Sequence, residues 1–181
     1  MRKLIVTEYL TADGITEGFE QWFFPFWDDE IGRVKHNELF ASDTLIYGRV
    51  TYQLFAAQWM SKTSDDSGFA ARLHAMPKYV VSRTLTTTEW NNSSLIGANV
   101  ADEVRKIKAQ PGEDILVAGS ATLVETLREH DLVDEYRLMV FPVLWGNGKR
   151  FFADGKRSNL KLESSQVFGS GVVLQTYRPE P

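Results

Sequence analysis

The stretch that decides the fold of this chain is residues 114–152, which read DILVAGSATLVETLREHDLVDEYRLMVFPVLWGNGKRFF. Its first apolar run, residues 115–118, is short, rich in β-branched residues and followed directly by Gly119, which predicts a buried strand and a tight turn. A helical pattern of apolar residues begins after this turn and ends near residues 128–130. Residues 136–141 then predict a second apolar strand. The stretch is therefore typical of a strand–turn–helix–strand unit in an α/β sheet.

The turn after the first of these strands, Gly119-Ser120-Ala121-Thr122, contains only small residues. Backbone N–H groups at the start of the following helix can therefore approach an anion closely, and the helix dipole favours negative charge there. A phosphate group fits this position. As a bare pattern, the turn is equally typical of an α/β crossover that binds no ligand. Ser120 lacks the Gly-x-Ser-x-Gly context of a hydrolase nucleophile, which argues against that class of enzyme.

The rest of the chain continues the alternation of strands and helices. Further strands are predicted at residues 3–10, 43–47 and 78–81, an amphipathic helix at residues 99–109, and two antiparallel strands at residues 159–168 and 172–177. A hydrophobic fraction of 43% in 181 residues suffices for one core of ordinary size. We therefore predict one α/β domain over residues 1–181, with a mainly parallel central sheet, helices on both faces and a C-terminal antiparallel hairpin.

Residues 17–27 have the most unusual composition in the chain, with six aromatic side chains around Pro25. These rings could stack on a bound heterocycle, close the open end of a core, or form a dimer contact. The acidic residues at 28–30 then predict the start of a helix whose Val34, Leu39 and Phe40 face inward.

The composition excludes several other classes of protein. A net charge of −4, with basic residues scattered along the chain, argues against nucleic-acid binding. The chain has no cysteine, and His36, His74 and His130 lie far apart in the sequence, so we expect no metal site. The N-terminal apolar run breaks at Thr7-Glu8, too early for a signal peptide, and no apolar run approaches about 18 residues. We therefore expect a cytoplasmic protein that does not contact a membrane.

A second candidate phosphate site follows the strand predicted at residues 43–47. There Gly48-Arg49-Val50-Thr51 begins a helix, so that backbone amides, a guanidinium group and a hydroxyl could surround one phosphate. The same pattern could also serve only as a helix cap.

Residues 132–152, LVDEYRLMVFPVLWGNGKRFF, with a glycine turn before the preceding helix, resemble the dihydrofolate-reductase-like superfamily. Within it, the chain is most similar, from Leu4 to Tyr177, to the reductase domain of the bifunctional riboflavin-biosynthesis deaminase/reductases and to its stand-alone relatives. The resemblance implies a dihydrofolate-reductase-like fold and hydride-transfer chemistry. It also implies that Gly48, Arg49 and Thr51 form the dinucleotide-binding Gly-Arg-x-Thr segment of that superfamily.

The end of the first strand carries a further part of the resemblance. Residues 11–16 are similar to the aspartate-glycine signature of the riboflavin reductases, which implies that Asp13 is catalytic and that Ala12 and Ile15 lie beside the nicotinamide. The chain has Thr11-Ala12 where the family usually has Ser-Leu. Taken without the resemblance, Asp13-Gly14 is typical of a strand-end turn that the aspartate caps.

The resemblance also bears on the choice of cofactor. Ser82 and Arg83 stand where a serine and a basic group of the family bind the adenosine 2′-phosphate, and no acidic residue marks a preference for NAD. NADPH is therefore the expected cofactor. The full set of predicted cofactor-binding residues is Ala12, Ile15, Gly48, Arg49, Thr51, Ser82, Arg83, Gly119, Ser120, Ala121 and Thr122.

We therefore predict an NADPH-dependent reductase of a small heterocyclic or ribosylamino-pyrimidine substrate, similar to 5-amino-6-(5-phosphoribosylamino)uracil reductase. A dihydrofolate or pterin reductase and a non-catalytic cofactor-binding member of the superfamily are the alternatives. We also expect a homodimer, because apolar residues 141–145 run into a glycine loop and the terminal hairpin leaves a sheet edge to be covered. The alternative is that Trp145 packs into its own core.

Overall fold

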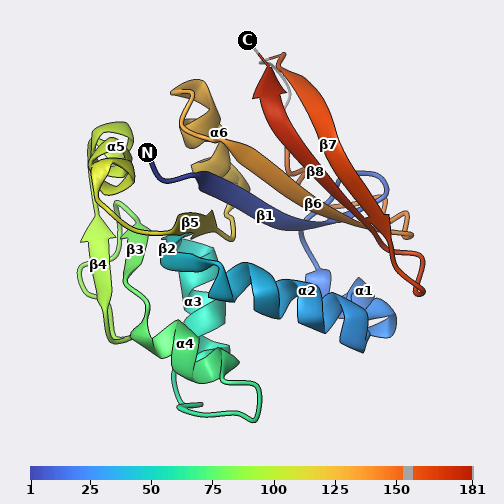
Figure 1. Cartoon of the computed structure of the whole chain (residues 1–181), viewed down its shortest axis with the longest axis horizontal. Helices are drawn as coiled ribbons and strands as arrows, with labels where there is room; N and C mark the ends of the chain where they lie inside the picture. Colours follow the sequence, from blue (N-terminus) through green and yellow to red (C-terminus); the bar gives the residue numbers. More distant parts are fainter. Residues whose placement is uncertain (153–156, 181) are drawn as a thin grey trace.

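An eight-stranded sheet forms the centre of the computed structural model, which describes residues 1–152 and 157–180, with the strand order β4-β3-β2-β5-β1-β6-β8-β7 (Figure 1). The strands are β1 (Leu4–Thr11), β2 (Ser42–Gly48), β3 (Lys78–Val81), β4 (Ser93–Ile96), β5 (Asp114–Val117), β6 (Glu135–Phe141), β7 (Asn159–Val167) and β8 (Val173–Glu180). Strands β1 to β6 pair in parallel, whereas β8 is antiparallel to both β6 and β7. The predicted parallel sheet with a C-terminal antiparallel hairpin is therefore confirmed.

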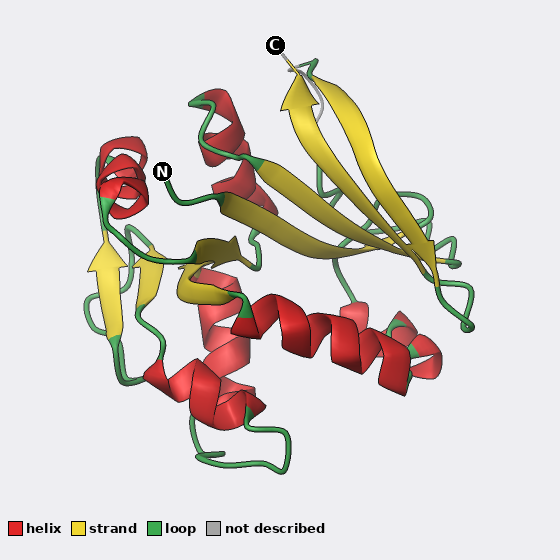
Figure 2. Cartoon of the chain, viewed as in Figure 1, coloured by secondary structure: helices red, strands yellow, loops and turns green. Residues whose placement is uncertain are grey.

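Helices cover both faces of this sheet, as predicted (Figure 2). They are α1 (Phe19–Trp22), the 3-10 helix η1 (Phe24–Phe26), α2 (Asp29–Phe40), α3 (Arg49–Trp59), α4 (Phe69–Ala75), α5 (Val100–Ala109) and α6 (Ala121–Glu129). Because side chains alternate along a strand, Leu4 and Val6 pack with residues of α5 and α6, whereas Ile5 packs with residues of α2, α3 and α4. Within the described residues, no helix is long and apolar enough to cross a bilayer.

The aromatic segment before α2 closes one end of the core. Trp22 and Phe23 are buried, and their rings lie 5.3 and 5.4 Å from the ring of Phe141 in β6. Phe24 and Trp27 stay exposed, at 60% and 42%. Of the three interpretations of this segment, closing the core is therefore confirmed for Trp22 and Phe23.

Helix α2 begins as predicted, but one of its three residues predicted to face inward does not. The side chain of Asp28 caps it by accepting a hydrogen bond of 2.8 Å from the backbone N–H of Ile31. The prediction that Phe40 faces inward was wrong, because its side chain is 41% exposed and its ring stacks on His36. At 3.6 residues per turn, Phe40 lies roughly half a turn away from the buried Ile31.

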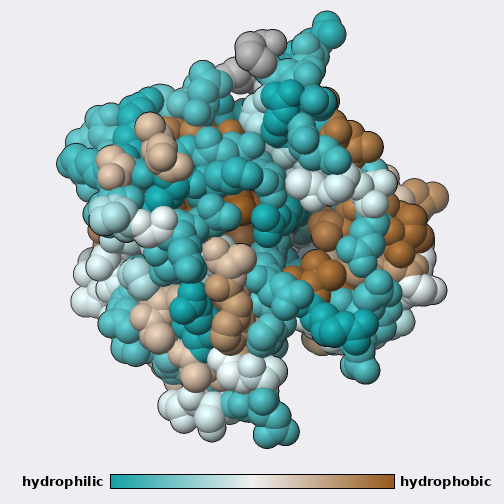
Figure 3. All heavy atoms as spheres, in the orientation of Figure 1, coloured by the Kyte–Doolittle hydropathy of each residue, from teal (hydrophilic) through white to brown (hydrophobic). Residues whose placement is uncertain are grey.

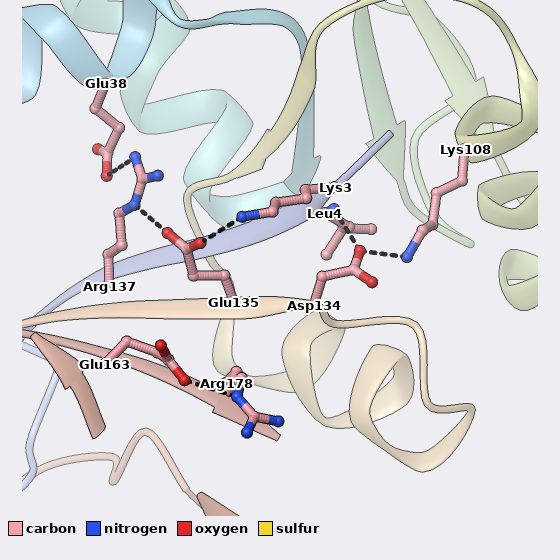
Figure 4. Close-up of polar contacts among 9 residues, drawn as sticks. All are labelled: Lys3, Leu4, Glu38, Lys108, Asp134, Glu135, Arg137, Glu163 and Arg178. Atoms are coloured by element: carbon pink, nitrogen blue, oxygen red, sulfur yellow. Dashed lines mark hydrogen bonds and ion pairs between the residues drawn. The ribbon is translucent and has the colours of Figure 1, made fainter. Parts of the chain in front are cut away.

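Charged side chains join the starts of β1 and β6 to the surrounding helices (Figure 4). Asp134 accepts hydrogen bonds from the backbone N–H of Leu4 and from the ammonium group of Lys108 in α5. Lys108 is only 5% exposed and also donates to the carbonyl of Leu132 at 2.8 Å, so its charge is paired and hydrogen-bonded where it is buried. These contacts fix the amino ends of the two strands against α5.

Leu127→Ala tests the core that holds α6 on the sheet. The Leu127 side chain is completely buried, and its truncation leaves a cavity, so we expect the free energy of unfolding to fall by about 2–5 kcal/mol. Leu54→Ala is the matched control, because Leu54 is 51% exposed on α3, and it should change stability by less than about 0.5 kcal/mol. Urea denaturation measures both values. Equal effects of the two substitutions would contradict the described packing.

Candidate functional site

The connections that leave β2 and β5, which are neighbours in the sheet, run in opposite directions across it. The chain leaves these neighbouring strands toward opposite edges of the sheet, since α3 and α4 connect β2 to β3 and α6 connects β5 to β6 (Figure 1). In open α/β sheets, ligands bind outside the carboxyl ends of the strands at such a switch point. The strand ends there are Gly48, the first residue of one predicted phosphate site, and Val117, two residues before the other.

The two predicted phosphate turns meet at this switch point. The backbone N–H of Gly48 donates to the carbonyl oxygen of Gly119 at 3.1 Å, and the Gly119–Ser120 peptide bond is cis. A Cβ added to Gly48 would collide with the Ser120 hydroxyl. Gly119 has a φ of +82°, a conformation that strains residues with a side chain. Both turns therefore require glycine, and they bring the starts of α3 and α6 into direct contact.

Strand β1 also reaches the place where the two glycine turns meet. Strand β1 pairs with β5 only from Leu4 to Val6, whereas it pairs with β6 as far as Thr11. Beyond Val6, β1 therefore has no partner on its β5 side among the described residues, and we call this unpaired side of residues 7–11 the sheet split. A Cβ added to Gly119 would lie 3.0 Å from Oε2 of Glu8 and 3.3 Å from Oγ1 of Thr51. Glu8, Thr51 and Gly119 thus converge from β1, α3 and the β5–α6 turn.

Sequence reasoning missed Glu8, although one signal pointed to it: a carboxylate inside an otherwise mainly apolar strand. In β1 the carbonyl of Lys3 points toward β5, where it accepts from Ile115, so the N–H of Tyr9 points to the same side by strand alternation. That N–H donates to Oε1 of Glu8 at 3.1 Å. The Glu8 carboxyl therefore takes up the position that a β5 residue would fill if β5 continued.

The surroundings of Glu8 change its proton affinity. Burial raises the pKa of the Glu8 carboxyl from 4.5 to about 7, and this effect outweighs the hydrogen bond from Tyr9 and the positive charge of Lys35, which both lower the pKa. Perturbed carboxyl groups of this kind are concentrated at functional sites.

Lys149 is a second residue that sequence reasoning missed. It follows the loop at residues 142–148, and its ammonium group donates to Oγ1 of Thr122 in the first turn of α6 at 2.8 Å. Its own backbone N–H donates to Glu17 at 2.9 Å. A positive charge is thus present beside the amino end of α6, where the backbone already favours an anion.

The predicted residues at the ends of β2 and β3 lie on neighbouring strands. Gly48 pairs with Val81, so Arg49 and Ser82 follow directly along the same edge of the sheet. The guanidinium group of Arg49 is exposed and donates to Gln53 at 3.0 Å. The Ser82 hydroxyl accepts from the backbone N–H groups at positions 84 and 85, so it holds the turn after β3, while Arg83 is exposed.

Asp13 holds the loop that carries Lys149. Its carboxylate accepts hydrogen bonds from the Thr11 hydroxyl at 2.6 Å and from the backbone N–H groups of Trp145 at 3.1 Å and Gly146 at 2.7 Å. The same three donors, with Thr11 first, lower the pKa of Asp13 from 3.8 to about 2. Asp13 is therefore ionised at neutral pH and bound on both oxygens. The geometry gives it the role of a loop anchor, and a catalytic role stays a prediction.

Ala12 and Ile15, the other residues predicted to bind the cofactor in the turn after β1, differ in their exposure and contacts. Ala12 is exposed, and its N–H donates to the carbonyl of Val143 at 2.9 Å. The Ile15 side chain is only 4% exposed. The carbonyl of Ile15 accepts from the N–H of Thr11, which closes the turn. Their predicted contact with a nicotinamide is not tested by these environments.

Depressions among the described residues lie on the surface away from this region. One is lined by residues 75, 77 and 88–94, and another by residues 1–3, 109–112 and 114. Neither includes a residue of the two glycine turns. Among residues 1–152 and 157–180, no group of three or more His, Asp or Glu side chains is arranged to hold a metal ion.

Glu8→Gln is expected to stabilise the fold at pH 8. The folded chain holds the Glu8 proton more tightly than the unfolded chain, so ionisation destabilises the folded state as pH rises from about 4.5 to about 7. Glutamine removes this cost and can still accept from the N–H of Tyr9. We expect a gain on the order of 1–3 kcal/mol at pH 8 and almost none at pH 4, measured by urea denaturation. An equal gain at both pH values would contradict the role of ionisation.

Comparison with known proteins agrees with this architecture. The model of the family described as RibD C-terminal domain matches residues 2–174. The chain is 36% identical over 184 residues to the uncharacterized protein YyaP of Bacillus subtilis (strain 168), covering 97% of this chain and 94% of YyaP.

Solved structures share the fold. A protein from Shewanella sp. PV-4 superposes with a TM-score of 0.79 at 19% identity, covering 99% of both chains. A diaminohydroxyphosphoribosylaminopyrimidine deaminase/5-amino-6-(5-phosphoribosylamino)uracil reductase from Thermotoga maritima superposes with a TM-score of 0.69 at 15% identity, covering 99% of this chain and 57% of that chain. The family resemblance seen in the sequence is thereby confirmed: the chain belongs to the RibD C-terminal domain family, a family of dihydrofolate-reductase-like reductase domains.

Proposed function

We propose that this chain is an NADPH-dependent reductase that transfers hydride to a small heterocyclic or ribosylamino-pyrimidine substrate. The observation that carries the proposal is the meeting of two glycine turns at the switch point of the sheet, where a Cβ on Gly48 would collide with Ser120. A site built from two glycine turns at the amino ends of two helices suits the pyrophosphate of a dinucleotide. The name of the Thermotoga maritima relative supports the substrate class.

The residues around the turns fit such a cofactor. Backbone N–H groups at the start of α3 and α6 supply donors, and the hydroxyls of Thr51 and Thr122 lie on the first turns of the same two helices. Arg49 and Lys149 supply positive charge from two sides. This donor set is matched to phosphate oxygens rather than to a neutral ligand.

When bound, the reduced nicotinamide would supply a hydride to the substrate. The chain itself has to orient the two reacting groups and exclude water. Asp13 contributes by fixing the loop with Trp145 and Gly146 against the end of β1. The aromatic residues Trp22 and Phe23 support β6 beneath that loop through Phe141.

A preference for NADPH over NADH follows from the basic residues at the ends of β2 and β3. Arg49 and Arg83 lie at neighbouring strand ends and are exposed. A pair of guanidinium groups favours a 2′-phosphate over a free ribose hydroxyl.

Arg49→Ala is the direct test of this preference. Loss of a charge-assisted contact of roughly 1.5–3 kcal/mol should weaken NADPH binding by roughly 10- to 100-fold, with little change for NADH. The Arg49 side chain contacts Gln53 at the helix surface, so the fold should survive the substitution. Arg33→Ala, at an exposed position of α2, is the matched control and should leave both affinities unchanged. Equal binding of NADPH and NADH by the wild-type chain would refute the preference.

We also propose that the chain forms a homodimer through the β7 edge of the sheet. Strand β7 is the outermost strand, with Leu162 and Val167 exposed at 50% and 70%. Leu162 pairs with Tyr177 and Val167 pairs with Val173, four residues apart on β8, so both side chains lie on one face of the hairpin. Hydrophobic surface gathers on the side of the molecule that carries α1 and the tip of this hairpin (Figure 3). An exposed apolar edge is most simply covered by the same edge of a second copy.

The dimer is tested by light scattering of the double variant Leu162→Lys/Val167→Lys. We expect the mass of two chains for the wild type and of one chain for the variant, because charge on an edge strand opposes pairing. Leu54→Lys on α3 is the control and should stay dimeric. Trp145 is unsuitable for this test, because it packs against its own chain beside Gly18. A wild-type mass of one chain would refute the dimer.

A further inference from the structure

We propose that Glu8 is part of the dinucleotide site in its protonated form, so that the chain takes up a proton when it binds NADPH above neutral pH. This inference rests on the proposed function, because it assigns a role to a side chain inside the proposed cofactor site. It goes beyond that function by linking cofactor affinity to pH through one named residue.

The position of Glu8 carries the inference. Its Oε2 atom would lie 3.0 Å from a Cβ on Gly119, the residue that begins the turn in front of α6. Thr51, the third residue of α3, is at the same point. The carboxyl therefore lies beside the turn in front of α6 and near the first turn of α3, the two helix starts that would bind the pyrophosphate. An ionised carboxylate there would repel a phosphate, whereas a protonated carboxyl group can donate a hydrogen bond to it.

The neighbouring charges leave this repulsion largely uncompensated. The positive charge of Lys35 in α2 lowers the pKa of Glu8, but this ammonium group is bound to the Glu38 carboxylate and to the Thr7 hydroxyl on the other face of β1. Glu38 also faces Arg137 of β6 at 3.5 Å. Tyr9 on β1 also interacts electrostatically with Glu8, and the basic residues at the starts of α3 and α6 are Arg49 and Lys149.

Arg49 and Lys149 favour the cofactor but do not neutralise Glu8. Arg49 and Lys149 contact Gln53 and Thr122 respectively, and both would attract the cofactor. Residues 119–122 contain no titratable side chain that could neutralise Glu8. An arriving phosphate adds negative charge next to the carboxyl, and a neighbouring like charge raises the pKa of a carboxyl group further. Since that pKa is already about 7 in the free chain, the proton is taken up within a pH range in which the protein can be studied.

The first experiment measures NADPH affinity between about pH 7 and pH 9, where the 2′-phosphate stays ionised because its second pKa is about 6. If only the protonated form of Glu8 binds, the affinity of the wild-type chain should fall by roughly tenfold per pH unit well above pH 7. Glu8→Gln keeps a neutral side chain at every pH, so its affinity should stay constant and should exceed that of the wild type by roughly 100-fold at pH 9.

Glu129→Gln is the matched control. It removes the same charge from the exposed carboxyl end of α6, at the opposite end of the helix from Gly119. Its affinity should follow the wild-type pH dependence. A fall in affinity with pH that is the same in Glu8→Gln as in the wild type would overturn the role of Glu8.

The second experiment counts protons by calorimetry at pH 8 in two buffers of different ionisation enthalpy. Wild-type binding should take up close to one proton per chain, and Glu8→Gln should take up almost none. NADPH binding by the wild type without proton uptake would overturn this inference and leave the proposed cofactor intact. No binding of NADPH at pH 7 would overturn the proposed function as well, so the two failures are distinguishable. Circular dichroism confirms that each variant is folded.

Discussion

The hydrogen bond from Gly48 to Gly119 is the contact on which the functional region depends. It joins the turn after β2 to the turn after β5, two segments that no local signal in the sequence connects. The absence of side chains at both positions lets the two backbones touch, because a Cβ on either glycine would meet neighbouring atoms at or inside normal contact distance. The amino ends of α3 and α6 consequently point at one place, and their partial positive charges act together on any ligand there.

The early end of β5 creates the second constraint. Because β1 continues for five residues after its pairing with β5 ends at Val6, one side of β1 is left to side chains and loops. Glu8 and Asp13 occupy this side of the molecule with opposite properties. Asp13 is held ionised by three donors, with a pKa of about 2, whereas burial raises the pKa of Glu8 to about 7. The turn after β1 thus carries a fixed negative charge that anchors a loop, and β1 itself carries a titratable group that faces the glycine turns.

Charged contacts fix the position of α2 relative to β1 and β6. Arg137 of β6 bonds to Glu135 on its own strand and faces Glu38 of α2, while Lys3, just before β1, reaches Glu135 as well (Figure 4). Partly buried ion pairs of this kind contribute little net stability when both partners are present, and they become costly when one partner is removed. Their effect is to specify how α2 packs on β1 and β6, next to the sheet split.

The sequence by itself determined the elements and their class. Periodicity and turn chemistry are local properties, so seven of the eight strands, the helix cap at Asp28, the glycine turns and the terminal hairpin could be predicted. Strand β4 was not predicted, because Leu95 and Ile96 are its only apolar residues. The place of Phe40 was predicted wrongly, because it depends on which face of α2 the rest of the core selects.

Only the tertiary structure decided what each polar group does. Asp13 accepts from Gly146, 133 residues away, and Lys149 reaches Thr122 from a different loop. Glu8 acquires its raised pKa from burial against segments that lie far away in the chain. A side chain's proton affinity and partners depend on the atoms packed around it, and those atoms come from distant parts of the sequence once the sheet order has been set.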